Sequence, residues 1–283
     1  MKLFYRKYPH SNSVSENKPG HGTGDAAIQT SNADSSPLII LHGLFGAGGN
    51  WHSLSANRFS KVSDVYVVDQ RNHGRSPHSD SFTFNDMVSD LLELLDDLDI
   101  DTVSILGHSM GGKTAMHFAL TYPDRVDRLV IADVSPVPYP DKHAHIFKAL
   151  RSVQPGKYGT RQEIDAVLAE TLPTAAVRQF LMKNLVRKAG GFEWMINLEV
   201  IQASYMELRE EVDGWPPFTG ETLFLKGELS DYISEKHYPA ILRLFPEARI
   251  EVLKGTGHWM HADAPESFAD AVLGALVDGS MNV

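Results

Sequence analysis

A serine between two glycines stands in the middle of the chain, and a histidine preceded by glycine stands near its end. The first lies in Gly107-His108-Ser109-Met110-Gly111, a G-x-S-x-G motif, and the second in Gly257-His258-Trp259. A serine hydroxyl is a weak nucleophile, and a histidine can take its proton at neutral pH. We predict acyl transfer with Ser109 as the nucleophile and His258 as the general base.

The residues around Ser109 predict the sharp turn that this chemistry needs. The apolar run Val103 to Leu106 ends directly before the motif, and a helical pattern begins directly after it. Glycines at positions 107 and 111 allow a tight strand-to-helix turn, where a side chain would clash. Such a turn lifts the serine hydroxyl above the sheet.

Two other histidines compete with His258 for the role of base. His108 is next to Ser109 in sequence, but consecutive residues on a sharp turn point apart. His261 heads the following segment and has no glycine turn beside it. His258 follows the predicted strand Arg249 to Leu253 and completes the chain order serine, acid, histidine. It is therefore the preferred base.

The carboxylate that would orient His258 is not decided by chain order. Asp133 follows the predicted strand Leu129 to Ile131, and Asp231 follows the predicted strand Thr222 to Leu225. Both lie at carboxyl ends of strands, where sites form in parallel sheets. Glu228 is a weaker third candidate. Asp69, in the segment Asp69 to Ser76, precedes the nucleophile, and we interpret it as structural.

Two backbone N–H groups are candidates for an oxyanion hole, which stabilises the charge that develops on a carbonyl oxygen. One belongs to Met110, directly after the nucleophile. The other belongs to Leu44 in His42-Gly43-Leu44-Phe45-Gly46, where glycines let the backbone fold tightly after a predicted strand.

The elements that must position these residues alternate between strands and helices. Continuous apolar runs predict buried parallel strands at Leu38 to Leu41, Val65 to Val68 and Val103 to Leu106. We predict a mostly parallel sheet flanked by helices, formed by residues 1–135 and 216–283. Residues 136–215 show helical patterns, among them one from Thr174 to Val186, without a convincing strand and predict a helical cap. Lys2 to Tyr8 predict an edge strand, and the polar residues 9–36 predict a mobile loop.

Composition limits the class of protein. Lys and Arg number 26 and Asp and Glu number 36, so the net charge of −10 argues against a nucleic-acid partner. The chain has no cysteine, and no apolar run approaches the roughly 20 residues of a membrane helix. The sequence predicts a cytoplasmic enzyme without a membrane span, a bound metal or a cofactor, acting as a monomer or a homodimer.

Together these motifs resemble the α/β-hydrolase superfamily, and in particular the small YbfF-type esterases, a group that includes the abhydrolase-domain-eleven proteins. The resemblance covers nearly the whole chain from Leu38 and rests on the segments His42 to Gly46, Asn50-Trp51, Asp69 to Pro77, Gly107 to Lys113, Asp133 to Pro136 and Gly257 to Ala262. It implies an α/β-hydrolase fold and cofactor-free hydrolysis of acyl esters, extending to acyl-CoA thioesters. It favours Asp133 as the acid, with Asp231 as the alternative.

The predicted cap would supply an apolar pocket for the acyl part of the ester. The candidate substrate-binding residues are Phe45, Phe147, Phe180 and Trp194. Perhydrolysis of the haloperoxidase type and hydrolysis of C–C bonds use the same serine triad and stay alternatives. A noncatalytic ligand-binding protein on the same fold is a third reading, which the complete set of serine, histidine and acid disfavours.

Overall fold

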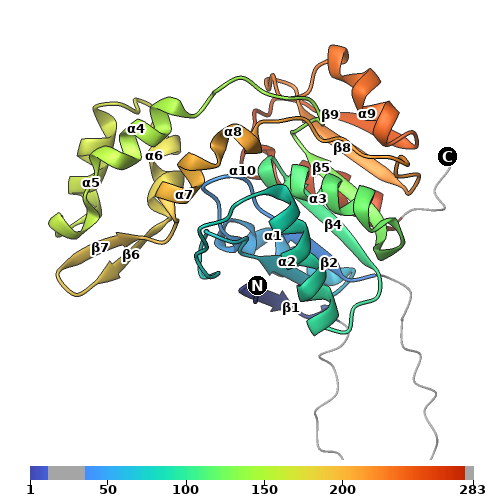
Figure 1. Ribbon diagram of the computed structural model, residues 1–283, viewed down its shortest axis with the longest axis horizontal. Coiled ribbons are helices and arrows are strands. Elements are labelled where there is room, and N and C mark those ends of the chain that lie inside the picture. Colours follow the sequence, from blue (N-terminus) through green and yellow to red (C-terminus); the bar gives the residue numbers. More distant parts are fainter. Residues whose placement is uncertain (12–35, 278–283) are drawn as a thin grey trace, which may run out of the picture.

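A seven-stranded sheet forms the centre of the computed structural model, which describes residues 1–11 and 36–277 (Figure 1). The strands lie in the order β1 (Tyr5–Tyr8), β3 (Val65–Val68), β2 (Leu38–Leu41), β4 (Val103–His108), β5 (Val126–Ala132), β8 (Thr222–Gly227) and β9 (Ala248–Leu253). Only β1, at the edge, is antiparallel to its neighbour. The predicted mostly parallel sheet is confirmed. The predicted mobile loop falls almost entirely outside the described residues.

Alternate residues of the strands enter two separate apolar clusters, one on each face of the sheet. Ile39 and Leu41 pack with one set of helices, whereas Leu38 and Ile40 pack with the other. The first set comprises α2 (Phe84–Asp97), α3 (Met110–Thr121) and α9 (Tyr238–Leu244), and the second comprises α1 (His52–Asn57) and α11 (Pro265–Val277). Because both faces are covered, the central strands are apolar throughout rather than alternating. No helix in the described ranges has the length and apolar character needed to cross a membrane.

Residues 136–215, here called the cap segment, lie to one side of the sheet (Figure 1). They form α4 (Ala144–Ser152), α5 (Arg161–Ala169), α6 (Ala175–Met182), α7 (Leu198–Ala203) and α8 (Tyr205–Leu208). Their apolar side chains make a third cluster that also includes Phe45, Phe84 and Met110 from the rest of the chain. The cap is therefore packed against the segment that follows β2 and against the start of α3.

The cap segment also contains a hairpin, so the expectation of helices without a strand was wrong. The strands β6 (Leu185–Lys188) and β7 (Gly191–Trp194) pair antiparallel around a two-residue turn. Gly190 in this turn has a φ of +87°, which glycine adopts readily and other residues rarely do. The helix predicted from Thr174 to Val186 correspondingly ends at Met182.

A buried lysine joins both ends of the cap segment to the helix behind the nucleophile motif. The ammonium group of Lys113, on α3, donates to the carbonyl oxygens of Val137 (3.2 Å), Arg209 (3.3 Å) and Glu210. Burial lowers the pKa of Lys113 to about 8. These contacts fix the entry and the exit of the cap relative to the motif that contains Ser109.

Candidate active site

Ser109 occupies a strained turn between β4 and α3. Its backbone has a φ of +53° and a ψ of −118°, a conformation that residues other than glycine rarely adopt. A Cβ added to Gly107 would lie 2.4 Å from the carbonyl oxygen of Gly111, and one added to Gly111 would lie 2.3 Å from that of Leu41. The two glycines of the motif are therefore required for the helix to start this close to the sheet.

His258 and Asp133 meet although 125 positions separate them. The Nδ1 atom of His258 lies 2.8 Å from Oδ2 of Asp133, whose side chain is fully buried. The Asp133 carboxylate also accepts hydrogen bonds from the backbone N–H of Gly227 (3.1 Å) and from the hydroxyl of Ser230. The His258 ring stacks on Tyr232, with centroids 4.1 Å apart. Contacts with His258, Gly227 and Ser230 fix the position of the Asp133 carboxylate.

The structure does not bring the other candidate acids to His258. The Asp231 side chain is 81% exposed and forms an ion pair of 2.5 Å with Lys142, which lowers the pKa of Asp231. Glu228 accepts a hydrogen bond from the backbone N–H of Gly255 at 2.7 Å. Both carboxylates hold loops at the edge of the sheet.

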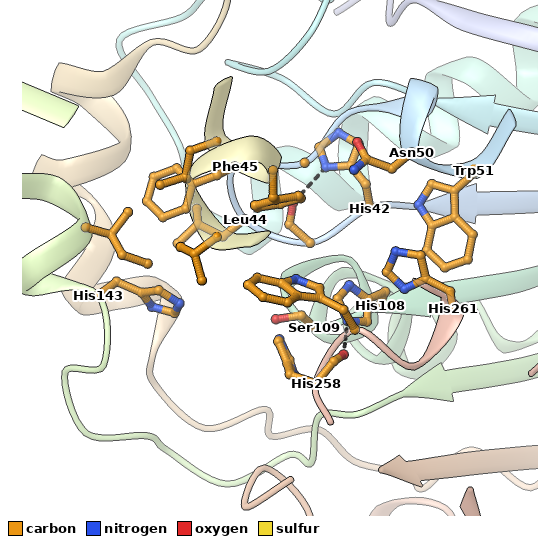
Figure 2. A pocket seen from close by; sticks show the side chains of 17 residues that line it. His42, Leu44, Phe45, Asn50, Trp51, His108, Ser109, His143, His258 and His261 are labelled. Atoms are coloured by element: carbon orange, nitrogen blue, oxygen red, sulfur yellow. Dashed lines mark hydrogen bonds between the residues drawn. The ribbon is translucent and has the colours of Figure 1, made fainter. Parts of the chain in front are cut away.

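Ser109 and His258 line the same cavity, here called the Phe180 cavity (Figure 2). In the described part of the chain, no hydrogen bond joins the hydroxyl of Ser109 to the His258 ring. Such contacts are often long in enzymes without substrate. A second cavity, here called the Tyr139 cavity, is also lined by Ser109. Their shared lining residues are Leu44, Ser109 and His143.

The two candidate oxyanion donors lie beside Ser109. Leu44 follows β2 and lines both cavities, and Met110, the first residue of α3, lines the Tyr139 cavity. Among the described residues, none accepts a hydrogen bond from the backbone N–H of either. The loop of Leu44 is held by Asn184 of the cap, whose amide donates to the carbonyl oxygen of Phe45 at 2.7 Å. No local pattern in the sequence pointed to Asn184.

The four candidate substrate-binding residues occupy different places. Phe45 and Phe180 line the Phe180 cavity, whereas Phe147 and Trp194 line neither of the two cavities described. Phe147 lies behind Phe45, with ring centroids 5.2 Å apart. Trp194 is on β7, pairs with Leu185, and packs within the cap cluster. The apolar lining also includes Ile146, Val177 and Leu181.

The two histidines that compete with His258 have other contacts. His108 Nε2 donates to the backbone carbonyl of His258 at 2.9 Å, so its ring supports the loop that carries His258. His261 stacks on Trp51, with centroids 4.4 Å apart, and burial lowers its pKa to about 3. A base with so low a pKa is weak at neutral pH.

The segment after β3 makes contacts that join neighbouring parts of the fold. Asp69 accepts hydrogen bonds from the backbone N–H groups of Gly48 (2.6 Å) and Arg75 (2.9 Å), which joins two loops. Arg71 forms a two-pronged contact with buried Asp90, at 2.6 and 2.8 Å. Within residues 1–11 and 36–277, no three His, Asp or Glu side chains are placed to hold a metal ion.

Neutral histidines that are buried (His73) or half-buried (His117, His143 and His261) make stability sensitive to acid. Burial lowers the pKa of His73 and His261 to about 3, and of His117 and His143 to about 4. Below pH 6.5 the unfolded chain binds protons that these folded side chains exclude, so the free energy of unfolding falls as the pH falls towards 4. Each histidine steepens the fall by up to about 1.4 kcal/mol per pH unit. Urea unfolding at pH 7, 6 and 5 should show this decrease in the free energy of unfolding. The decrease with falling pH should be smaller in His117→Gln, whereas His145→Gln, at an exposed position, should match the unmodified protein. A midpoint independent of pH would contradict the prediction.

Comparison with known proteins places this arrangement in a family. Residues 36–265 match the alpha/beta hydrolase fold family. The chain is 41% identical to sn-1-specific diacylglycerol lipase ABHD11 of Xenopus laevis, over 83% of this chain and 78% of that protein. It is 36% identical to esterase YbfF of Escherichia coli strain K12, over 86% of this chain and 92% of that protein.

A solved structure agrees with the sequence comparisons. The structure described as a marine microorganism esterase superposes with a TM-score of 0.87 at 39% identity, over 97% of this chain and 99% of that one. The strained serine turn, the order of the strands and these similarities agree with the resemblance noted in the motifs. The chain therefore belongs to the α/β-hydrolase family.

Proposed function

We propose that this protein is a serine carboxylesterase that hydrolyses acyl esters through Ser109, His258 and Asp133. The observation that carries the proposal is the 2.8 Å contact between His258 and buried Asp133, beside a serine held on a strained turn. A histidine oriented by a carboxylate can remove the proton of a neighbouring serine hydroxyl. The names of the relatives, esterase and lipase, support the same class of reaction.

The proposed reaction has two steps. Ser109 attacks the ester carbonyl while His258 takes its proton, and the N–H groups of Leu44 and Met110 bind the oxyanion. The tetrahedral intermediate then loses the alkoxide, which receives the proton from His258, and an acyl-enzyme remains. Water hydrolyses this ester with His258 again as the base.

The two cavities give the two halves of an ester separate places. The Phe180 cavity is lined by Phe45, Ile146, Phe180 and Leu181, and we assign it to the acyl chain. The Tyr139 cavity then takes the alcohol, and the ester group lies at Ser109, where the cavities meet. Acyl-CoA thioesters enter the proposed substrate class because a thiolate leaves by the same steps.

A hydrolysis assay tests this function. The full chain is incubated with p-nitrophenyl esters from acetate to palmitate and with the matching acyl-CoAs. We expect hydrolysis with an optimum of acyl length, and labelling of Ser109 by a fluorophosphonate probe, located by peptide mass spectrometry. A folded protein that hydrolyses none of these substrates and takes up no probe would contradict the proposal.

A further inference from the structure

A histidine of the cap stands at the point where the two cavities meet. His143 is the residue directly before α4, and it lines both the Phe180 cavity and the Tyr139 cavity. The other residues that line both are Ser109 and Leu44, which belong to the core and to which we assign parts in the reaction. His143 is therefore the contribution of the cap segment to this junction, and its side chain extends towards it (Figure 2).

Contacts on three sides fix the His143 ring. Its Nδ1 atom lies 2.6 Å from the hydroxyl oxygen of Tyr205, at the start of α8. Phe45 and Tyr205 meet the ring edge-on, with centroids 6.0 and 5.4 Å away. The backbone N–H of His143 donates to the Asp141 carboxylate at 3.0 Å. In the described part of the chain, no residue is hydrogen-bonded to Nε2, the ring nitrogen that remains.

The contact with Tyr205 is the basis on which we assign the proton of the His143 ring. Burial raises the pKa of Tyr205, so its phenol stays protonated. We assign the Tyr205 proton to the 2.6 Å contact between the phenol oxygen and Nδ1 of His143. Burial, together with nearby His258, lowers the pKa of His143 to about 4, so the ring is neutral at pH 7. A neutral imidazole that accepts at Nδ1 carries its proton on Nε2.

We propose that His143 is a further catalytic residue, whose Nε2–H donates a hydrogen bond to the alkoxy oxygen of the bound ester. This inference rests on the proposed esterase function. The ester group occupies the junction, and Leu44 and Met110 take its carbonyl oxygen. The alkoxy oxygen is the other hydrogen-bond acceptor of the ester group, and Leu44 and Met110 do not bind it. Charge develops on that oxygen as its bond to carbon breaks, and a fixed neutral donor stabilises this charge.

The proposal predicts a selective loss in His143→Leu. This variant keeps an apolar side chain of comparable size and removes the donor. We expect kcat for ethyl and other alkyl esters to fall by about 100-fold, the loss typical of one removed donor. For p-nitrophenyl esters, whose leaving group needs little stabilisation, the fall should be much smaller. The plot of rate against leaving-group pKa should therefore become steeper.

Three controls separate this role from a structural one. Tyr205→Phe removes the hydroxyl that donates to Nδ1 of His143, so the ring can carry its proton on either nitrogen. This variant should lose less kcat than His143→Leu, with the same dependence on the leaving group. His145→Leu, at an exposed position two residues further on, should leave the rates unchanged. The rate of fluorophosphonate labelling reports Ser109 and His258 separately, and it should stay near that of the unmodified protein in His143→Leu.

Each alternative result would overturn the inference. Unchanged alkyl ester hydrolysis in His143→Leu would show that the donor is not used. An equal loss for all esters, together with lost probe labelling, would show that His143 only supports the site. If the unmodified protein hydrolyses no ester, the proposed function fails instead, and that outcome is seen before any variant is made.

Discussion

Ser109→Ala should abolish ester hydrolysis, with kcat lowered on the order of 10⁵- to 10⁶-fold. The variant removes the only atom that we assign to covalent attack, and neither His258 nor the oxyanion donors can replace it. Some acceleration over water should remain, because oxyanion binding does not need the hydroxyl. Initial rates with p-nitrophenyl butyrate and mass spectrometry of the fluorophosphonate adduct would measure both effects.

The fold should survive this substitution. The backbone at position 109 has a φ of +53°, and alanine adopts this conformation about as readily as serine does. The hydroxyl of Ser109 is not hydrogen-bonded to any residue that the structure describes, so its removal breaks no such contact. We therefore expect a melting temperature within a few degrees of the unmodified protein. Ser53→Ala, at an exposed serine on α1, is the matched control and should retain full activity. Activity that persists in Ser109→Ala would contradict the nucleophile assignment.

Local sequence patterns were sufficient to predict the central strands of the sheet, because these strands are buried on both faces and are therefore apolar throughout. The runs Leu38 to Leu41 and Val65 to Val68 were predicted with the bounds that β2 and β3 have in the structure. The edge strand β1 at the amino terminus was also anticipated. In each run the physical cause is contained within the segment itself.

The cap hairpin was missed although its signal is local. Ala189-Gly190 separates two short segments, and a Gly at a turn between such segments is a hairpin signal. The apolar residues from Thr174 to Val186 fit a helical period, and that fit extended the predicted helix beyond Met182. The helix ends just before β6 begins to pair with β7, and a helical period in the sequence gives no information about that pairing.

Other features of the site depend on residues far apart in the chain. Lys113 follows the nucleophile motif, but the carbonyl groups that surround its ammonium come from positions 24 and about 97 residues away. Asn184 and His143 reach the site only because the cap folds over Leu44 and Phe45. No pattern within a short window can reveal such contacts.

The choice between Asp133 and Asp231 also depends on contacts that a local sequence pattern does not contain. The strands β5 and β8 are adjacent and parallel, so the residues that follow them emerge at the same edge of the sheet. Asp133 comes directly after β5 and has a φ of +50°, and its carboxylate is buried against His258. Asp231 lies four residues beyond the end of β8, in solvent. Only these conformations separate two aspartates that are equivalent in chain order.

Asp133→Asn should lower kcat by about 10⁴-fold, whereas Asp231→Asn should change it by less than about twofold. The amide of asparagine cannot hold the His258 ring in the tautomer that accepts a proton from Ser109, and it carries no charge to stabilise the imidazolium. Asp231 pairs with Lys142 at the surface, and exposed ion pairs contribute little. Rates with p-nitrophenyl butyrate at pH 7.5 compare the two variants directly.

Asp133→Asn also changes a buried group that accepts hydrogen bonds from Gly227 and Ser230, and this can lower stability by about 1–3 kcal/mol. Activity must therefore be compared below the melting temperature of each variant. Ser230→Ala is the matched control, since it removes one bond to Asp133 but leaves the carboxylate and its contact with His258. We expect Ser230→Ala to be destabilised while keeping kcat within about tenfold. If Ser230→Ala were as inactive as Asp133→Asn, or if Asp231→Asn were the inactive variant, then Asp133 would hold the loops together and the orientation of His258 would have another source.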